Sequence, residues 1–218
     1  MSLFVPILIF RLDQEISDDL MSRLSILMSS GLPSEATAVQ QKSYVSFSCI
    51  PQGQEEAEKE PTITLLERRH LISGSKTTGF RTWEAALHLG AYLLSVEGQE
   101  QVRGKSILEL GAGTGFISIL AAKYLDARHV TTTDGDEGVV EALKENLFLN
   151  GLDDGKKVNT SVLRWGQGLK GTWVQEDCEA FPYDLVIGAD IVRKEEVIPV
   201  LLADVYSRRT TRLPSRHS

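Results

Sequence analysis

Residues 107–115 read Ile-Leu-Glu-Leu-Gly-Ala-Gly-Thr-Gly, an apolar strand with one acid near its end that leads directly into a glycine-rich turn. Because glycine has no Cβ, a turn built from Gly111, Gly113 and Gly115 allows a ligand to approach the backbone closely. The helix predicted to follow points its first amide donors at the same place. Glycines after a strand are also ordinary turn formers, so the turn alone leaves a ligand site and a plain connection open.

The residues around this turn alternate between strand-like and helix-like patterns. Strands are predicted over 106–110, 129–133, 158–163 and 183–189. Helices are predicted over 84–96, 116–124, 137–150 and 194–206. Strands that alternate with helices imply right-handed crossover connections. The predicted fold class is therefore α/β, with a mainly parallel, doubly wound sheet.

The first 75 residues carry a different pattern. A helix is predicted over 17–30, and strands are predicted over 44–49 and 62–67. Residues 51–61, between the two strands, are rich in Glu and are interpreted as a solvated polar loop. A small α+β extension is therefore expected ahead of the sheet.

Four candidate ligand residues follow the predicted strands. In an open parallel sheet, ligands bind at the carboxyl ends of the strands. Asp134 ends the second strand, where a carboxylate can accept hydrogen bonds from both ribose hydroxyls, and Trp165 follows the third with a flat face for a purine. Ala189 and Asp190 end the fourth. Two alternatives remain open: Asp134 or Asp136 caps the next helix, and Trp165 is an ordinary core or surface residue.

The turn differs from a dinucleotide-binding fingerprint. It reads GxGxG, and Phe116 stands where the third glycine of GxGxxG would be. Glu109 lies two residues before the first glycine, where an acid is well placed to approach an amino group. The methionine end of S-adenosylmethionine carries such a group, so this acid favours that ligand.

Composition narrows the class of protein. The 218-residue chain has a formal net charge of -7, which argues against nucleic acid as a direct partner. Cys49 and Cys178 are far apart and lack metal-ligand spacing, so neither a disulfide framework nor a metal site is expected. The apolar stretch 3–10 is too short to span a membrane. We expect a cytoplasmic protein without a membrane partner.

Four motifs in order carry a family resemblance. Residues 109–115 (ELGAGTG) resemble motif I of class I S-adenosylmethionine-dependent methyltransferases. Residues 76–86 (KTTGFRTWEAA), 162–166 (VLRWG) and 184–190 (DLVIGAD) resemble the lysine methyltransferases of methyltransferase family 16. Within that family, the TTGxRTWEAAL segment is most similar to the fungal elongation factor 2 lysine methyltransferases. The resemblance covers residues 60–206.

The resemblance implies a Rossmann-like seven-stranded fold and S-adenosyl-L-methionine as cofactor. It implies that Gly111 to Gly113 approach the methionine moiety, that Asp134 holds the ribose and that Trp165 flanks the adenine. Together with the acid before the turn, these residues give the expected cofactor-binding set: Trp83, Glu109, Gly111, Ala112, Gly113, Asp134, Trp165 and Ala189. Asp190 is the expected catalytic residue, which orients the substrate lysine. It matches the acid of the family's (D/E)xx(F/Y) motif, in which this chain has Arg193 at the aromatic position.

These patterns lead to one expected function and two alternatives. The expected function is protein-lysine N-methylation by a monomer, with elongation factor 2 as the protein substrate. The alternatives are a cofactor-binding remnant without activity and a small-molecule methyltransferase. Residues 1–75 are expected to form the extension, 76–206 an incomplete methyltransferase domain and 207–218 an irregular tail. Because no pattern for strands five to seven follows the fourth, a C-terminally truncated product or a short isoform is expected.

Overall fold

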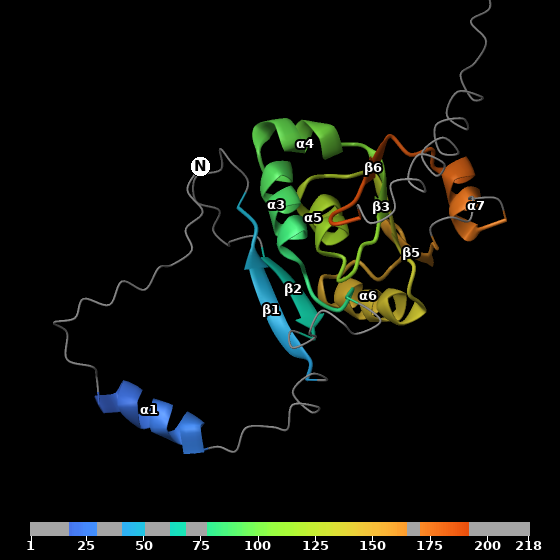
Figure 1. Cartoon of the computed structure of the whole chain (residues 1–218). Coiled ribbons are helices and arrows are strands. Elements are labelled where there is room, and N and C mark those ends of the chain that lie inside the picture. The colour runs from blue at the N-terminus through green and yellow to red at the C-terminus, as the bar shows by residue number, and fades with distance from the viewer. Residues whose placement is uncertain (1–17, 30–40, 51–61, 69–77, 165–170, 192–218) are drawn as a thin grey trace, which may run out of the picture. The chain divides into compact units, whose positions relative to one another are not determined.

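Figure 1 shows the computed structural model, which describes residues 18–29, 41–50, 62–68, 78–164 and 171–191. The chain divides into two compact units, Met1–Ala38 and Val39–Ser218. Helix α1 (Asp18–Ser29) belongs to the first unit and confirms the helix predicted over 17–30. Every other element described below belongs to the second unit.

A parallel sheet forms the centre of the second unit. Its four described strands have the order β5-β4-β3-β6, and each neighbouring pair is parallel. The strands are β3 (Ser106–Leu110), β4 (His129–Asp134), β5 (Val158–Val162) and β6 (Leu185–Ile187). The chain moves outward from β3 through β4 to β5 and then returns to β6 on the other side of β3. The carboxyl end of β3 is therefore the point at which the strand order reverses, as the doubly wound prediction requires.

Helices cover both faces of this sheet. The described helices of the second unit are α3 (Glu84–Leu93), α4 (Val96–Val102), α5 (Phe116–Tyr124), α6 (Glu137–Leu149) and α7 (Trp173–Ala180). Ile107 of β3 packs in one core with Leu120 of α5, whereas Leu108 packs in a second core with Val174 and Cys178 of α7. Successive residues of a strand point to opposite faces, so α5 and α7 lie on opposite sides of the sheet (Figure 1).

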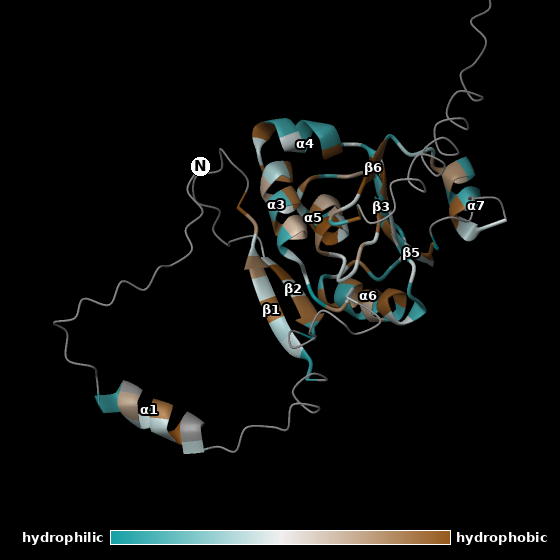
Figure 2. Ribbon diagram, in the orientation of Figure 1, coloured by the Kyte–Doolittle hydropathy of each residue, from teal (hydrophilic) through white to brown (hydrophobic). Residues whose placement is uncertain are grey.

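The local sequence explains the burial of α5 and the bounds of α6. The first seven residues of α5 are all buried, as expected for a helix against the centre of a sheet. Helix α6 instead alternates between hydrophobic and hydrophilic residues, which is typical of a helix with one solvated face (Figure 2). The Asp136 side chain caps its first turn by accepting a hydrogen bond from the Val139 amide (3.0 Å). Gly151, in the left-handed region, follows its last turn.

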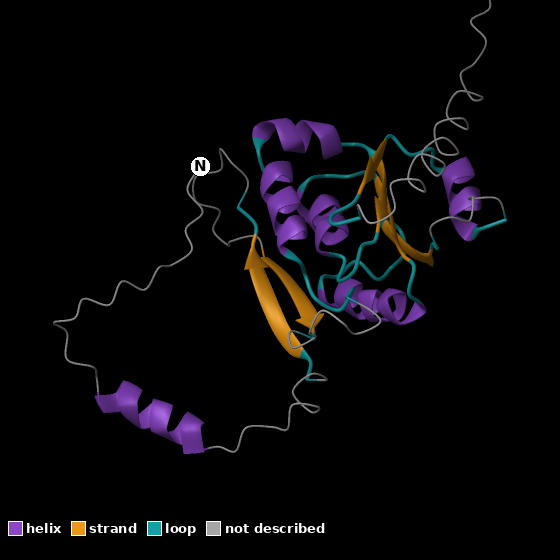
Figure 3. Ribbon diagram, viewed as in Figure 1, coloured by secondary structure: helices purple, strands orange, loops and turns teal. Residues whose placement is uncertain are grey.

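A two-stranded hairpin lies apart from the parallel sheet (Figure 3). Strands β1 (Ser43–Ser48) and β2 (Thr62–Glu67) are antiparallel and confirm the two predicted strands within one residue at each end. Ile63 and Leu65 of β2 are fully buried in the same core as α5. The hairpin and the sheet therefore share one core, while the division of the chain at residue 75 stays a prediction.

Side chains of α5, of α6 and of the residue that follows α6 cover the free edge of β2. The amides of Thr62, Thr64 and Leu66 donate to oxygens of three side chains. These acceptors are Tyr124 Oη (3.0 Å), Asn150 Oδ1 (3.3 Å) and Asn146 Oδ1 (2.7 Å), respectively. An unpaired strand edge is open to other chains, and here two asparagines and a tyrosine replace the missing strand.

The prediction of a single helix over 84–96 is wrong, because the structure has a break between α3 and α4. Ser95 is extended, and its hydroxyl accepts a hydrogen bond from the Gly98 amide (3.2 Å), which starts a new helix. A Cβ at Gly98 would lie 2.1 Å from the Tyr92 carbonyl oxygen. Gly98 therefore permits a close packing of α4 against the end of α3. The spacing of apolar residues along the chain does not predict such a contact.

Other differences concern the C-terminal part. Helix α7 was not predicted, although Thr172 caps it and Val174 and Cys178 have helical spacing. Strand β6 is shorter than the predicted strand over 183–189. The helix predicted over 194–206 and the tail 207–218 lie outside the described residues. No helix in the described part of the chain is long and apolar enough to cross a membrane.

Candidate functional site

A cavity of about 570 Å³ opens at the carboxyl ends of β3, β4 and β6. Its lining includes every predicted site residue that the structure describes: Trp83, Glu109, Gly111, Ala112, Gly113, Asp134, Ala189 and Asp190. Trp165 lies outside the described residues. The structure therefore brings together side chains from four separate segments of the chain, whereas their individual roles stay predictions.

The glycine-rich turn has a backbone that suits only glycine at three positions. Gly111, Gly113 and Gly115 have φ angles of 66°, 56° and 82°. A Cβ at Gly113 would lie 3.2 Å from the carbonyl oxygen of Gly79, and a Cβ at Gly115 would lie 2.1 Å from Cδ1 of Leu143. The turn is thus held close both to Gly79 and to Leu143 of α6, and at Gly111 and Gly113 it presents only backbone to the cavity.

Asp134 and Asp136 divide between them the two roles that sequence reasoning left open. Asp136 caps α6. Asp134 instead accepts hydrogen bonds from the amides of Gly113 (3.1 Å) and Asp136 (3.1 Å), one on each carboxylate oxygen. Burial raises the pKa of Asp134, although these amide bonds act in the opposite direction. Asp134 is therefore held rigidly at the cavity, with lone pairs on both oxygens left for a ligand.

Glu109 is a buried acid behind the glycine-rich turn, with only 2% of its surface exposed. Burial raises its pKa to about 7, and the neighbouring Asp134 acts in the same direction. Ser118 of α5 donates a hydrogen bond to its Oε2, which partly opposes the shift. A carboxyl group that titrates near neutrality at a cavity wall responds strongly to a cationic ligand group, because a nearby positive charge favours its ionised form.

The segment 78–83 forms one wall of the cavity. Nε1 of Trp83 donates to the carbonyl oxygen of Thr78 (2.9 Å), and the Arg81 guanidinium lies 5.0 Å from the centre of the Trp83 ring. Arg81 also pairs with Glu84 at 2.7 Å. Sequence reasoning singled out Trp83 and missed Thr78, Arg81 and Thr82, which also line the cavity. Their place in the same TTGFRTWEAA motif was the signal available.

The segment after β6 contributes an exposed acid to the cavity. Asp190 follows β6 and has a φ of 57°, a left-handed conformation that is uncommon for residues other than glycine. Arg164, which also lines the cavity, pairs with Glu137 at 2.7 Å. Arg193, which follows in the same motif, lies outside the described residues. Asp190 is therefore an exposed acid of the cavity lining at the carboxyl end of β6.

Charge at the cavity is predominantly negative. Glu109, Asp134, Asp136 and Asp190 contribute carboxyl groups, and the arginines of the lining each have a glutamate partner. Such a lining favours a cationic ligand or substrate over an anionic one. Among the described residues, no group of three or more His, Cys, Asp or Glu side chains is arranged to hold a metal ion.

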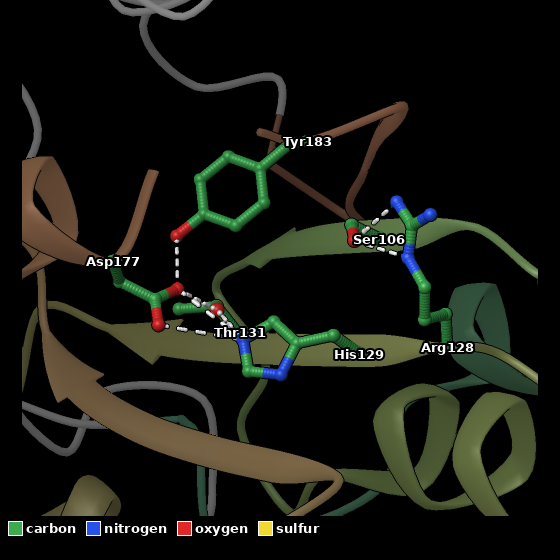
Figure 4. A network of polar contacts seen from close by, with 6 residues as sticks. All are labelled: Ser106, Arg128, His129, Thr131, Asp177 and Tyr183. Carbon is green, nitrogen blue, oxygen red and sulfur yellow. Dashed lines mark hydrogen bonds and ion pairs between the residues drawn. The ribbon is translucent and has the colours of Figure 1, made fainter. Parts of the chain in front are cut away.

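A second polar cluster lies on the α7 side of the sheet, away from the cavity lining (Figure 4). Asp177 of α7 accepts a hydrogen bond from Tyr183 (2.6 Å) and one from Thr131, and its Oδ1 lies 3.3 Å from Nε2 of His129. Burial by itself would raise the pKa of Asp177, but these partners together lower it. The cluster attaches α7 to β4 and is structural.

The family model and the curated relatives that match this chain point to one family. A sequence model described as lysine methyltransferase matches residues 65–211. The protein-lysine N-methyltransferase EFM3 of Chaetomium thermophilum is 49% identical over 190 residues, which are 86% of this chain and 55% of that protein. The mouse EEF1A lysine methyltransferase 3 is 41% identical over 56% of this chain and 47% of that protein. The human protein-lysine N-methyltransferase EEF2KMT is 31% identical over 65% of this chain and 43% of that protein. The chain therefore spans about half the length of the curated relatives it matches.

Proposed function

This chain belongs to the lysine methyltransferase family, and on that premise we propose that it transfers a methyl group from S-adenosyl-L-methionine to a lysine of elongation factor 2. The observation that carries the proposal is the cavity itself. It unites the glycine-rich turn, the braced carboxylate of Asp134 and the exposed acid Asp190 at the switch point of a parallel sheet.

The residues of the cavity fit this cofactor. Gly111 and Gly113 line the cavity without side chains, and their bare backbone leaves room for the methionine moiety. The rigidly held Asp134 carboxylate suits two adjacent ribose hydroxyls, and the buried Glu109 suits a positively charged amino group. Trp83 and Ala189 line the same cavity and complete the proposed contacts. Trp165 is proposed to flank the adenine.

Catalysis in this proposal depends on positioning. When bound, the cofactor supplies a methyl group on a positively charged sulfur, and the transfer is an in-line displacement. The protein must therefore hold the lysine nitrogen in line with the bond between the methyl carbon and the sulfur. Asp190 accepts a hydrogen bond from the lysine amine and fixes its direction. A lysine near another positive charge has a lowered pKa, which favours the neutral amine needed for attack.

The electrostatics support a cationic acceptor. Arg81 and Arg164 would repel a lysine if they were unpaired, but Glu84 and Glu137 each lie 2.7 Å from them. Asp190 has an exposed side chain at the cavity, where the lysine side chain would enter. The substrate class is thus supported by charge, and elongation factor 2 is proposed from the family resemblance of residues 76–86.

The decisive test is transfer of a labelled methyl group in vitro. The chain is incubated with tritiated S-adenosyl-L-methionine and purified elongation factor 2, and in parallel with elongation factor 1A and with free lysine. We expect label in elongation factor 2, at a lysine located by mass spectrometry. Label only in elongation factor 1A would overturn the substrate assignment. Absence of label from both proteins would overturn protein methylation by this chain.

Asp190→Asn tests the catalytic role separately. The amide keeps the size of the side chain and removes its charge. We expect methyl transfer to fall by about 100-fold or more, while binding of S-adenosyl-L-methionine in a calorimetric titration changes by less than about threefold. A matched control is Asp154→Asn, since Asp154 is an exposed acid that does not line the cavity. Equal activity of the two variants would contradict the role of Asp190.

A further inference from the structure

We propose that the β1–β2 hairpin is a positioning element of the cofactor site, which acts on Thr114 of the glycine-rich turn through two buried side-chain connections. The first runs from Glu67 through Thr82, and the second runs through Asn146. The part of this inference that concerns the cofactor rests on the proposed function. Glu67, Thr82 and Asn146 are thus assigned as positioning residues.

The first connection is a chain of three side chains. Glu67, the last residue of β2, is 2% exposed, and its Oε1 accepts hydrogen bonds from the Thr82 hydroxyl (2.6 Å) and the Thr82 amide (3.3 Å). The Thr82 and Thr114 hydroxyl oxygens are 2.7 Å apart. Because Thr82 has a single hydroxyl proton and donates it to Glu67, Thr114 is the donor in the second bond. The chain therefore fixes the orientation of the Thr114 side chain.

The second connection reaches the backbone of the same residue. Oδ1 of Asn146 accepts from the Leu66 amide of β2 (2.7 Å), and its Nδ2 donates to the Thr114 carbonyl oxygen (3.0 Å). Asn146 is 2% exposed. Two adjacent residues of β2, Leu66 and Glu67, thus hold the backbone and the side chain of Thr114 from different directions.

The position of Thr114 makes these connections relevant to the cofactor. Thr114 lies between Gly113 and Gly115, which have positive φ angles, and it lines the cavity. A turn rich in glycine has more freedom to lose on ordering than other backbone, so fixing the Thr114 side chain reduces that freedom. Thr82 itself lies in the 78–83 wall, and the carbonyl of Phe80 in this wall accepts from the Arg68 amide (2.9 Å). The hairpin, with Arg68 directly after it, thereby orders both the turn and the adjacent wall.

The test compares Thr82→Val with Thr82→Ser in the full chain. Valine has nearly the same shape but no hydroxyl, so the two bonds of the Thr82 hydroxyl, to Glu67 and to Thr114, are lost while the bond of the Thr82 amide to Glu67 stays; serine keeps all three. The first readout is amide hydrogen exchange of residues 111–116 without cofactor, and the second is the Kd for S-adenosyl-L-methionine. For Thr82→Val we expect about tenfold faster exchange and about tenfold weaker binding, because a buried acceptor is left unsatisfied. Thr82→Ser should stay within about threefold of the wild type in both.

Thr131→Val is the matched control. It removes a hydrogen bond between a buried threonine and a buried carboxylate, that of Asp177, on the other side of the sheet. We expect it to lower the melting temperature without changing exchange at residues 111–116 or the cofactor Kd. If Thr82→Val does not fold, Thr114→Val breaks only the last bond of the chain and should give the same direction of change.

The outcomes separate this inference from the proposed function. Unchanged exchange and binding in Thr82→Val, or equal effects in Thr131→Val, overturn the positioning role. Failure of the wild type to bind S-adenosyl-L-methionine overturns the proposed function, and the exchange measurement then still decides whether the hairpin orders the turn.

Discussion

The carboxylate of Asp134 accepts a hydrogen bond of 3.1 Å from the backbone amide of Gly113. This bond joins the end of β4 to the glycine-rich turn that follows β3, so two neighbouring strand ends are held together by a charged side chain. Hydrogen bonds to an ionised acceptor are stronger than neutral ones. The bond thus prepares both the turn and the carboxylate before any ligand arrives.

Replacing Asp134 should selectively weaken cofactor binding. Asp134→Asn removes the charge that braces Gly113 and that we propose to hold the ribose, and we expect the Kd for S-adenosyl-L-methionine to rise by about tenfold or more. Asp154→Asn is the control, because Asp154 is an exposed acid that does not line the cavity. Its substitution should change the Kd little. Calorimetric titration of both variants checks this, and similar losses in the two would contradict it.

Gly113→Ala should affect both stability and binding. Alanine in the left-handed region costs about 1–2 kcal/mol, and its Cβ would lie 3.2 Å from the Gly79 carbonyl oxygen. Gly104 has a similar φ of 68° but open space around it, so Gly104→Ala isolates the backbone effect. We expect both variants to unfold at lower denaturant concentration, and only Gly113→Ala to bind S-adenosyl-L-methionine more weakly. Equal binding by the two variants would show that the turn tolerates a Cβ.

Glu109 should make the stability of the protein depend on pH. Its pKa in the folded state is raised from an ordinary value of 4.5 to about 7, so the folded state binds the proton more tightly than the unfolded state. The resulting stabilisation is present below about pH 4.5 and is lost as the pH rises through about 7, with a size on the order of 3 kcal/mol. Glu109→Gln lacks this titration.

Denaturant unfolding at pH 5 and pH 8 checks the prediction for Glu109. The difference between the free energies of unfolding of Glu109→Gln and wild type isolates this group from all others that titrate. We expect that difference to shift in favour of the variant between pH 5 and pH 8. A difference that is the same at both pH values would show that the Glu109 carboxyl does not titrate in this range.

Local patterns predicted much of the sheet and helices. Strand β3 and helix α5 have the predicted bounds, because apolar periodicity and the glycines between them are properties of contiguous residues. The break between α3 and α4 was missed because it depends on Gly98 packing against the preceding helix. Helix α7 was missed because Val174 and Cys178 are too few apolar residues to form a clear periodic pattern among its polar and charged neighbours.

The sequence by itself determined the glycine-rich turn, the acids at the strand ends and the family to which they belong, because these features are short motifs whose spacing is set along the chain. Only the tertiary structure decided that Asp136 caps α6 while Asp134 braces Gly113. It alone also joined Glu67, Thr82 and Thr114 in one chain of hydrogen bonds. Such contacts connect residues that are distant in sequence, and directed hydrogen bonds depend on ångström-scale positions that only the packed core provides.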